Sequence, residues 1–220
     1  MKAYSASIQL QRFVRRAIAG VLVALVAASV VGWSSRALAQ GAEGATEKEK
    51  ELLAILRGDA PAAEKALACK RLAVYGSSAA VGDLAKLLSD ERLASWARIP
   101  LEAIPGAASD EALRKSLDGL SGNLLVGVIN SIGVRRDAGS VAALTARLTD
   151  KDPEVASAAA VALGHIGDGA ATKALRAALP EAPIKVRSAI AEGCILSAEK
   201  ALAAGRDAEA IEIYDEIRKA

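Results

Sequence analysis

The feature of this sequence that most constrains its fold is a phrase that occurs four times: an apolar helical run, a glycine, and seven to eleven residues later the leucine of another amphipathic stretch. Successive glycines of the phrase stand 30, 27 and 34 residues apart. Glycine tolerates the left-handed backbone that turns a chain back after a helix, so each one predicts a helix C-terminus. The pairs are Gly76 with Leu84, Gly106 with Leu113, Gly133 with Leu144, and Gly167 with Leu175.

The segments between these glycines have the apolar spacing of helices with one buried face. Val155, Ala159 and Ile166, for example, fall on one stripe at helical spacing. Aromatic residues make up only 3% of the chain, which favours closely packed helices over a β-sandwich. Helices of roughly 10 to 16 residues with one such face are marginal alone in water. The sequence therefore predicts an all-α fold in which helix pairs stack in a row and share a continuous core.

The stretch Asp150–Gly167, which reads DKDPEVASAAAVALGHIG, closely resembles the second helix of HEAT repeats, in particular the short phycobilisome-lyase-type variety. The resemblance is strongest over residues 124–179. It implies a right-handed α-solenoid of about five antiparallel helix pairs over residues 48–200, whose surface binds partners. Pro100 and Pro105 depart from the pattern and predict a kink or an early helix end.

The C-terminal stretch differs, because residues 201–214 resemble the middle of a tetratricopeptide repeat. In this resemblance Gly205 marks the turn, Ala210 the small packing position and Tyr214 the aromatic knob. We therefore expect a tetratricopeptide-like terminal helix over residues 201–220. It is expected either as a short final cap or as the cut end of a longer parent, with the second favoured.

The first 39 residues predict a cleaved signal peptide. An uncharged run over residues 17–33 follows three arginines and precedes a small-x-small cleavage site at residues 37–39. The alternative is an uncleaved membrane anchor, since 17 residues at about 1.5 Å each span roughly 25 Å, just under a hydrocarbon core of about 30 Å. Cleavage would leave residues 40–47 as a flexible leader and make the protein periplasmic or secreted.

Net charge bounds the class of partner. The whole chain carries +2, but residues 1–39 hold five cations and no acidic residue, so the remainder carries −3. Such a chain lacks the concentrated positive field that nucleic-acid binding draws on. We expect a protein partner, no nucleic acid, and membrane contact only through residues 17–33 if the signal segment is not cleaved.

Basic side chains on or near the predicted inner helices are the candidates for partner contact. If the curvature of a solenoid brings them together, they form a strip that receives an acidic segment of the partner. The alternative is ordinary solvated charge on helix faces. The candidates are Arg71, Arg98, Arg135, Arg136, Lys185 and Arg187.

We predict no catalytic, cofactor-binding or metal site. His165 is the one histidine and sits at a predicted helix end, where it suits the helix dipole, whereas a usual zinc set needs further ligands. The glycines are dispersed and form no phosphate-binding loop. Cys69 and Cys194 belong to the first and fifth helix pairs, about 35 Å apart for layers of roughly 8 to 10 Å, which is too far for a disulfide. Both are expected to be buried, with intermolecular pairing of Cys194 as the alternative.

These observations favour an exported, non-catalytic scaffold for protein–protein interaction. A second reading is the accessory HEAT-repeat arm of a larger exported enzyme, because such arrays are often fused to catalytic domains. A more remote third reading, suggested by the name of the repeat variety, is a bilin lyase-like protein. Export and the histidine-poor chain count against it.

Overall fold

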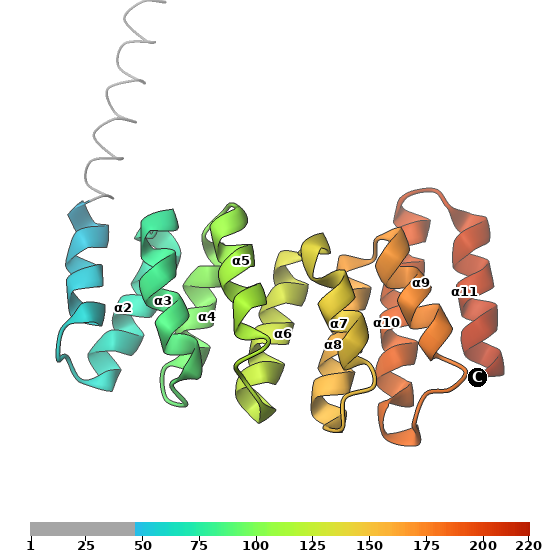
Figure 1. Cartoon of the computed structure of the whole chain (residues 1–220). Coiled ribbons are helices and arrows are strands. Elements are labelled where there is room, and N and C mark those ends of the chain that lie inside the picture. The colour runs from blue at the N-terminus through green and yellow to red at the C-terminus, as the bar shows by residue number, and fades with distance from the viewer. Residues whose placement is uncertain (1–46) are drawn as a thin grey trace, which may run out of the picture. The chain divides into compact units, whose positions relative to one another are not determined.

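The computed structural model describes residues 47–220, and this part of the chain consists of α-helices joined by short turns, with no strand (Figure 1). The all-α prediction is therefore confirmed. After a first helix over 47–57 come α2 (Ala62–Tyr75), α3 (Val81–Lys86), α4 (Ala94–Ala103), α5 (Ala107–Ser116), α6 (Gly122–Arg135), α7 (Val141–Arg147), α8 (Pro153–Ile166), α9 (Gly169–Ala178), α10 (Ile184–Ala203) and α11 (Asp207–Lys219).

The predictions for residues 1–39 and for the leader up to residue 46 lie outside the described residues. None of the helices in the described part is long and apolar enough to cross a membrane.

The helices form two rows. Helices α2, α4, α6, α8 and α10 each pack on the next, and we call them the second-helix row. Helices α3, α5, α7 and α9 form the first-helix row, and each packs on the helix that follows it in the chain. Counting 47–57 with α2 gives five pairs, and α11 packs on α10. This packing is consistent with HEAT-like repeats, while the handedness of the superhelix stays a prediction.

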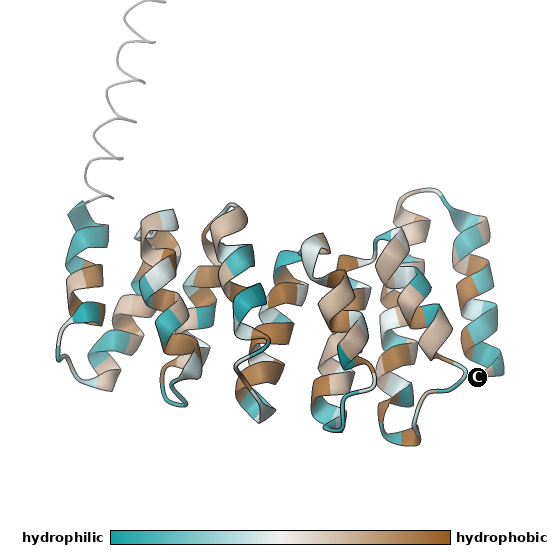
Figure 2. Cartoon of the chain, viewed as in Figure 1, coloured by the Kyte–Doolittle hydropathy of each residue, from teal (hydrophilic) through white to brown (hydrophobic). Residues whose placement is uncertain are grey.

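A single apolar core runs between the two rows. Apolar residues recur along successive helices (Figure 2), and one cluster of buried side chains extends from Leu52 to Ile213. The predicted stripe of α8 is buried, since Val155, Ala159 and Ile166 are each at most 5% exposed. The helices therefore hide their apolar faces by stacking, as the sequence predicts.

The predicted helix ends are partly confirmed. Gly167 ends α8 in the left-handed conformation (φ 54°), as expected. Gly76 ends α2 with extended backbone, and a Cβ there would lie 2.4 Å from the carbonyl oxygen of Leu72, so glycine is required by space rather than by φ. Gly133 lies inside α6, and Arg136 provides the left-handed C-cap (φ 54°), so the prediction for Gly133 was wrong.

The early helix end predicted for the proline-containing repeat is confirmed. α4 ends at Ala103, and its C-cap Ile104 precedes Pro105. Gly106 then begins α5 with φ 99° instead of ending a helix. Pro100 remains within α4 and is buried. Helix C-caps thus fall at Gly76, Ile104, Arg136 and Gly167, which are 28, 32 and 31 residues apart and so more evenly spaced than the glycines.

The C-terminal helices continue the array. The predicted boundary at residue 200 falls inside α10, which runs to Ala203. Gly205, with φ 72°, lies in the turn to α11, where Ala210 is fully buried and Tyr214 packs against the core. The tetratricopeptide-like character of this stretch stays a prediction.

Candidate partner-binding surface

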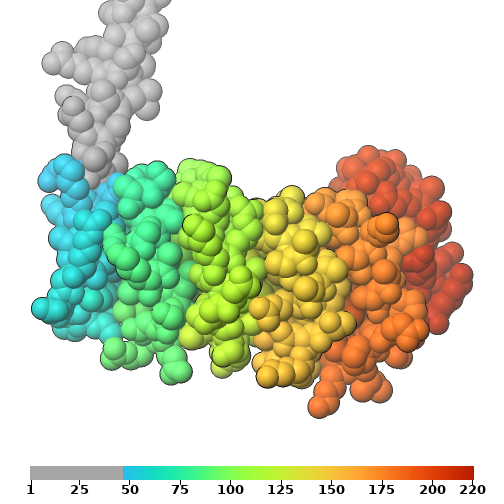
Figure 3. Space-filling model, viewed as in Figure 1, coloured from blue at the N-terminus to red at the C-terminus, as the bar shows by residue number. Residues whose placement is uncertain are grey.

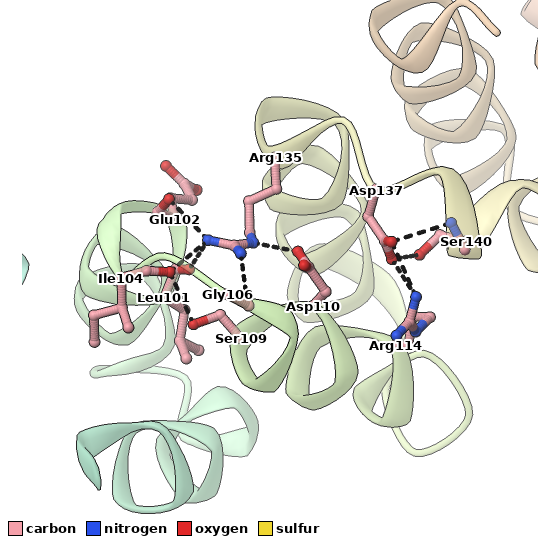
Figure 4. A network of polar contacts seen from close by, with 11 residues as sticks. Leu101, Glu102, Ile104, Gly106, Ser109, Asp110, Arg114, Arg135, Asp137 and Ser140 are labelled. Atoms are coloured by element: carbon pink, nitrogen blue, oxygen red, sulfur yellow. Dashed lines mark hydrogen bonds and ion pairs between the residues drawn. The ribbon is translucent and has the colours of Figure 1, made fainter. Parts of the chain in front are cut away.

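Arg135 holds the junction between α4 and α6. Its guanidinium, at the C-terminal end of α6, donates to the carbonyl oxygens of Leu101 (2.9 Å), Glu102 (3.1 Å), Ile104 (2.8 Å) and Gly106 (3.0 Å), as Figure 4 shows. Leu101 and Glu102 lie in the last turn of α4, whose final carbonyl groups have no partner within the helix, and Ile104 and Gly106 lie in the turn between α4 and α5. Its Nε also donates to Asp110, and the side chain is only 9% exposed. Arg135 is therefore a junction residue and not part of the open surface.

A second arginine fixes the neighbouring turn. Arg114 on α5 donates from Nη1 to both carboxylate oxygens of Asp137, at 2.9 and 3.0 Å. Asp137 also accepts hydrogen bonds from the Ser140 hydroxyl and the Gly139 amide, which caps the turn after α6 (Figure 4). The Arg135 and Arg114 networks together attach α6 and its following turn to α4 and α5.

Arg98 lies in the same junction. Its Nη1 donates to the carbonyl oxygen of Gly127 on α6 at 2.9 Å and reaches the Ser131 hydroxyl at 3.4 Å. Ser131, which is buried, donates to Glu102 at 2.6 Å. Gly127 makes room for this guanidinium, since a Cβ there would lie 2.9 Å from its Cζ atom.

The other four basic candidates are exposed, but they are spread along the molecule. Arg71 lies on α2, Arg136 caps α6, and Lys185 and Arg187 lie in the first turn of α10. The Arg187 guanidinium donates to the carbonyl oxygen of Ala182, which attaches the first turn of α10 to the turn that precedes it. The structure therefore does not gather the six candidates into one strip.

The histidine and the cysteines have structural positions. His165 is exposed in the last turn of α8, as the helix-dipole argument predicts. Cys69 and Cys194 are both free and buried, and their burial confirms the prediction. Burial raises the pKa of each thiol to about 11. Within residues 47–220, no cluster of three or more histidine, cysteine or acidic side chains has the arrangement to hold a metal ion.

The sequence reasoning missed a set of exposed apolar side chains. Of the ten large apolar residues that the described part exposes, nine belong to the second-helix row and the tenth, Ile211, to α11. The first-helix row exposes none of them. Trp96 is the one tryptophan of residues 48–200 in a chain with 3% aromatic residues, and it was the sequence signal that could have indicated this exposed apolar surface. The nine are Leu67, Val74, Tyr75, Trp96, Ile99, Val134, Ile184, Ile195 and Leu202.

Two of these residues line a groove between α2 and α4, which we call the α2–α4 groove. Leu67 and Lys70 of α2 line it together with Trp96 of α4 and Arg92 just before α4, and alanines of α2 form its floor. Its volume is about 450 Å³. Two cations border it, and no carboxylate of the described residues does.

A second hollow lies between α9 and α11, with a volume of about 750 Å³. Arg176 of α9 crosses it and donates to both carboxylate oxygens of Glu216 on α11, at 2.8 and 2.5 Å. This pairing lowers the pKa of Glu216 and raises that of Arg176. Arg176 and Glu216 therefore neutralise each other within the hollow.

In space-filling view the described residues form an elongated body, in which side chains fill the spaces between successive helices (Figure 3). These residues present an extended surface along the row of helices.

Comparisons with known proteins found a similar solved structure and a matching family model. A crystal structure of an engineered protein is similar, with 20% sequence identity, coverage of 78% of this chain and 94% of that chain, and a TM-score of 0.44. No curated protein matches the chain. The family model described as HEAT repeats matches residues 110–194, which include the segment of closest sequence resemblance, 124–179. The segment from α5 to the middle of α10 thus carries the sequence pattern of the HEAT repeat family.

Proposed function

We propose that this protein is a non-catalytic scaffold that binds a protein partner through the second-helix row. The observation that carries the proposal is the one-sided distribution of exposed apolar side chains, which the second-helix row displays and the first-helix row does not. Exposed apolar side chains that are grouped on one surface mark protein–protein interaction sites.

The repeat architecture supports this proposal. HEAT repeats, whose pattern residues 110–194 match, commonly mediate protein interactions. The successive helices of one row also present equivalent positions at regular intervals, which suits an extended contact.

We also propose that the protein works outside the cytoplasm. The support is the sequence of residues 1–39, with its arginines, uncharged run and small-x-small site. Comparing the N-terminus of the protein recovered from a cell-envelope fraction with the gene-encoded start tests this directly. An intact N-terminus in a cytoplasmic fraction would count against it.

Affinity capture tests the scaffold function. The full chain is immobilised, exposed to an envelope extract, and the retained proteins are identified and quantified. We expect a specific protein that is lost when Val134, Ile184 and Ile195 are replaced together by serine. These side chains are exposed, so their replacement leaves the core intact.

The matched control replaces three exposed residues of the first-helix row, Lys115, Ala142 and Lys173, by serine. The control variant should retain the partner as the unmodified chain does. Equal loss from both variants, or no retained protein at all, would contradict the proposal.

A further inference from the structure

Exposed apolar and basic side chains of the second-helix row meet at the α2–α4 groove. Leu67 and Trp96 are 48% and 39% exposed and line it from its two sides. Lys70 and Arg92 lie beside them. The contact of Arg92 with Asp90 is long, at 3.9 Å, and the Arg92 side chain is 78% exposed, so its charge is available at the surface.

The apolar surface continues beyond the groove along both helices. Val74 follows Lys70 by four residues on α2, and Ile99 follows Trp96 by three on α4, so both lie on the same helix faces as the groove residues. Both are exposed, at 76% and 41%. Arg71, on α2, is a third exposed cation beside Lys70 and Arg92. From Leu67 to Val74 the strip is roughly 10 Å long at about 1.5 Å per residue.

The volume of the α2–α4 groove and the charges that border it determine which kind of partner segment it can bind. A volume of about 450 Å³ accommodates a few side chains and no folded domain, so the occupant is a short segment. Tryptophan is the side chain that most often dominates interface energy when a partner covers it, and it favours a large apolar group as its contact. Cations without bordering carboxylates favour an acidic segment.

We propose that the α2–α4 groove binds an acidic segment of a protein partner, which inserts one large apolar side chain beside Trp96. The inference rests on the proposed scaffold function and names the chemistry of its partner at this site. The serine variant of the capture experiment alters α6 and α10 only, so the two proposals can fail separately.

The test begins with selection of random twelve-residue peptides, displayed on phage, against the full chain. We expect enriched peptides to carry two or more aspartate or glutamate residues next to a leucine, phenylalanine or tryptophan. A synthetic peptide of the enriched sequence, labelled with fluorescein, is then titrated by fluorescence polarisation. Its affinity should fall by about 10-fold between low salt and 0.5 M salt, because exposed charges are screened.

Variants locate the site. Trp96→Ala should weaken binding of the peptide by about 30-fold, as expected for a central aromatic anchor, and Trp96→Phe by less. The double reversal Lys70→Glu with Arg92→Glu should weaken it by about 10-fold or more. The control is Lys115→Glu, an exposed cation on α5 in the first-helix row, which should change the affinity less than about 2-fold.

Other results would overturn the inference. These are no enrichment of acidic peptides, equal binding of a peptide in which lysines replace the acidic residues, or binding that Trp96→Phe and the double reversal leave unchanged. Self-association of the full chain that the double reversal abolishes would also overturn it, since the occupant would then be a second copy.

Discussion

The second-helix row is built in two different ways along its length. At the α4–α6 seam, polar side chains fill the space: Arg98 and Arg135 reach from one helix to the backbone of the other. At the α8–α10 seam, the backbones themselves meet, because a Cβ on Gly193 would lie 2.5 Å from the Ala160 carbonyl oxygen and one on Gly164 would lie 2.7 Å from Gly193. The α6–α8 seam resembles the latter, with Gly133 against Ala162.

This difference indicates which contacts between helices tolerate a larger side chain. A seam of arginine hydrogen bonds adjusts when a neighbour grows, since the end of a long side chain moves at small cost. A seam of backbone contacts does not adjust, because interiors are close-packed and extra atoms force helices apart. The open surface features, Trp96 and the α2–α4 groove, lie toward the adjustable end of the row.

The largest expected effect distinguishes the two seams directly. Gly193→Ala should destabilise the protein by about 3 kcal/mol, because the added methyl group meets backbone atoms of α8. Gly127→Ala should stay within about 1 kcal/mol of the unmodified chain, since the methyl group meets only the movable guanidinium of Arg98 and alanine favours the helix. Denaturant unfolding measures both.

Gly82→Ala is the control for helix propensity, because nothing lies within 4 Å of a Cβ there. It should stabilise α3 by about 0.5 to 1 kcal/mol. Equal destabilisation by Gly127→Ala and Gly193→Ala would remove the distinction between the seams.

The next effect concerns the polar seam itself. Arg135→Met should cost about 2 kcal/mol, because the carbonyl groups at the end of α4 and the carboxylate of Asp110 lose their partner in a largely buried place. Arg136→Met removes an adjacent but exposed guanidinium and should change stability little. Thermal unfolding followed by circular dichroism measures the pair. Equal melting temperatures of the two variants would refute the junction role of Arg135.

The reactivity of the two buried thiols measures how readily α2 and α10, at opposite ends of the second-helix row, open to solvent. Cys69 lies on α2 and Cys194 on α10, and burial raises the pKa of both to about 11, so neither should react with a disulfide reagent at pH 8 unless its helix opens. We expect Cys69 to react about 10-fold faster than Cys194, a difference of about 1.4 kcal/mol in opening free energy. Cys69→Ala and Cys194→Ala variants give each rate separately. Cys194 should react more slowly because α10 is held by the backbone contacts of the α8–α10 seam, and faster reaction at Cys194 would contradict this reason.

The smallest expected effect is the response to acid. Hydrogen bonds from Arg57 and Lys86 lower the pKa of Asp83 below its ordinary value of 3.8, so the unfolded chain binds more protons than the folded one in acid. The stabilisation is present above about pH 4 and is lost as the pH falls through the folded-state pKa. Between pH 6 and pH 3, Asp83→Asn should therefore lose less stability than the unmodified chain, by less than about 1 kcal/mol. The free energy of unfolding of both proteins is measured against pH by denaturant unfolding. Equal losses between pH 6 and pH 3 would contradict this expectation.

Much of the fold could be predicted because helical periodicity and helix-end glycines are local signals. The buried stripe of α8, its C-cap Gly167 and the early end of α4 before Pro105 all follow from neighbouring residues. The role of Gly133 could not be predicted. A glycine is needed there because Ala162, which is 29 residues further along the chain on α8, lies against it. A close approach between helices leaves no mark in the local pattern.

The surface was harder to predict than the fold. The same basic residue type serves as a buried junction in Arg135 and as exposed charge in Arg71, and only long-range packing separates the two. The one-sided exposure of apolar side chains likewise depends on which helix face a neighbour covers.

Site-specific photo-cross-linking tests the central claim most directly. A photoreactive phenylalanine analogue replaces either Val134, exposed on α6 of the second-helix row, or Lys115, exposed on α5 of the first-helix row, and the full chain is irradiated in the cells that produce it. We predict a cross-linked protein partner from position 134 and none from position 115. A partner captured only from position 115 would place the contact surface on the opposite row and contradict the account.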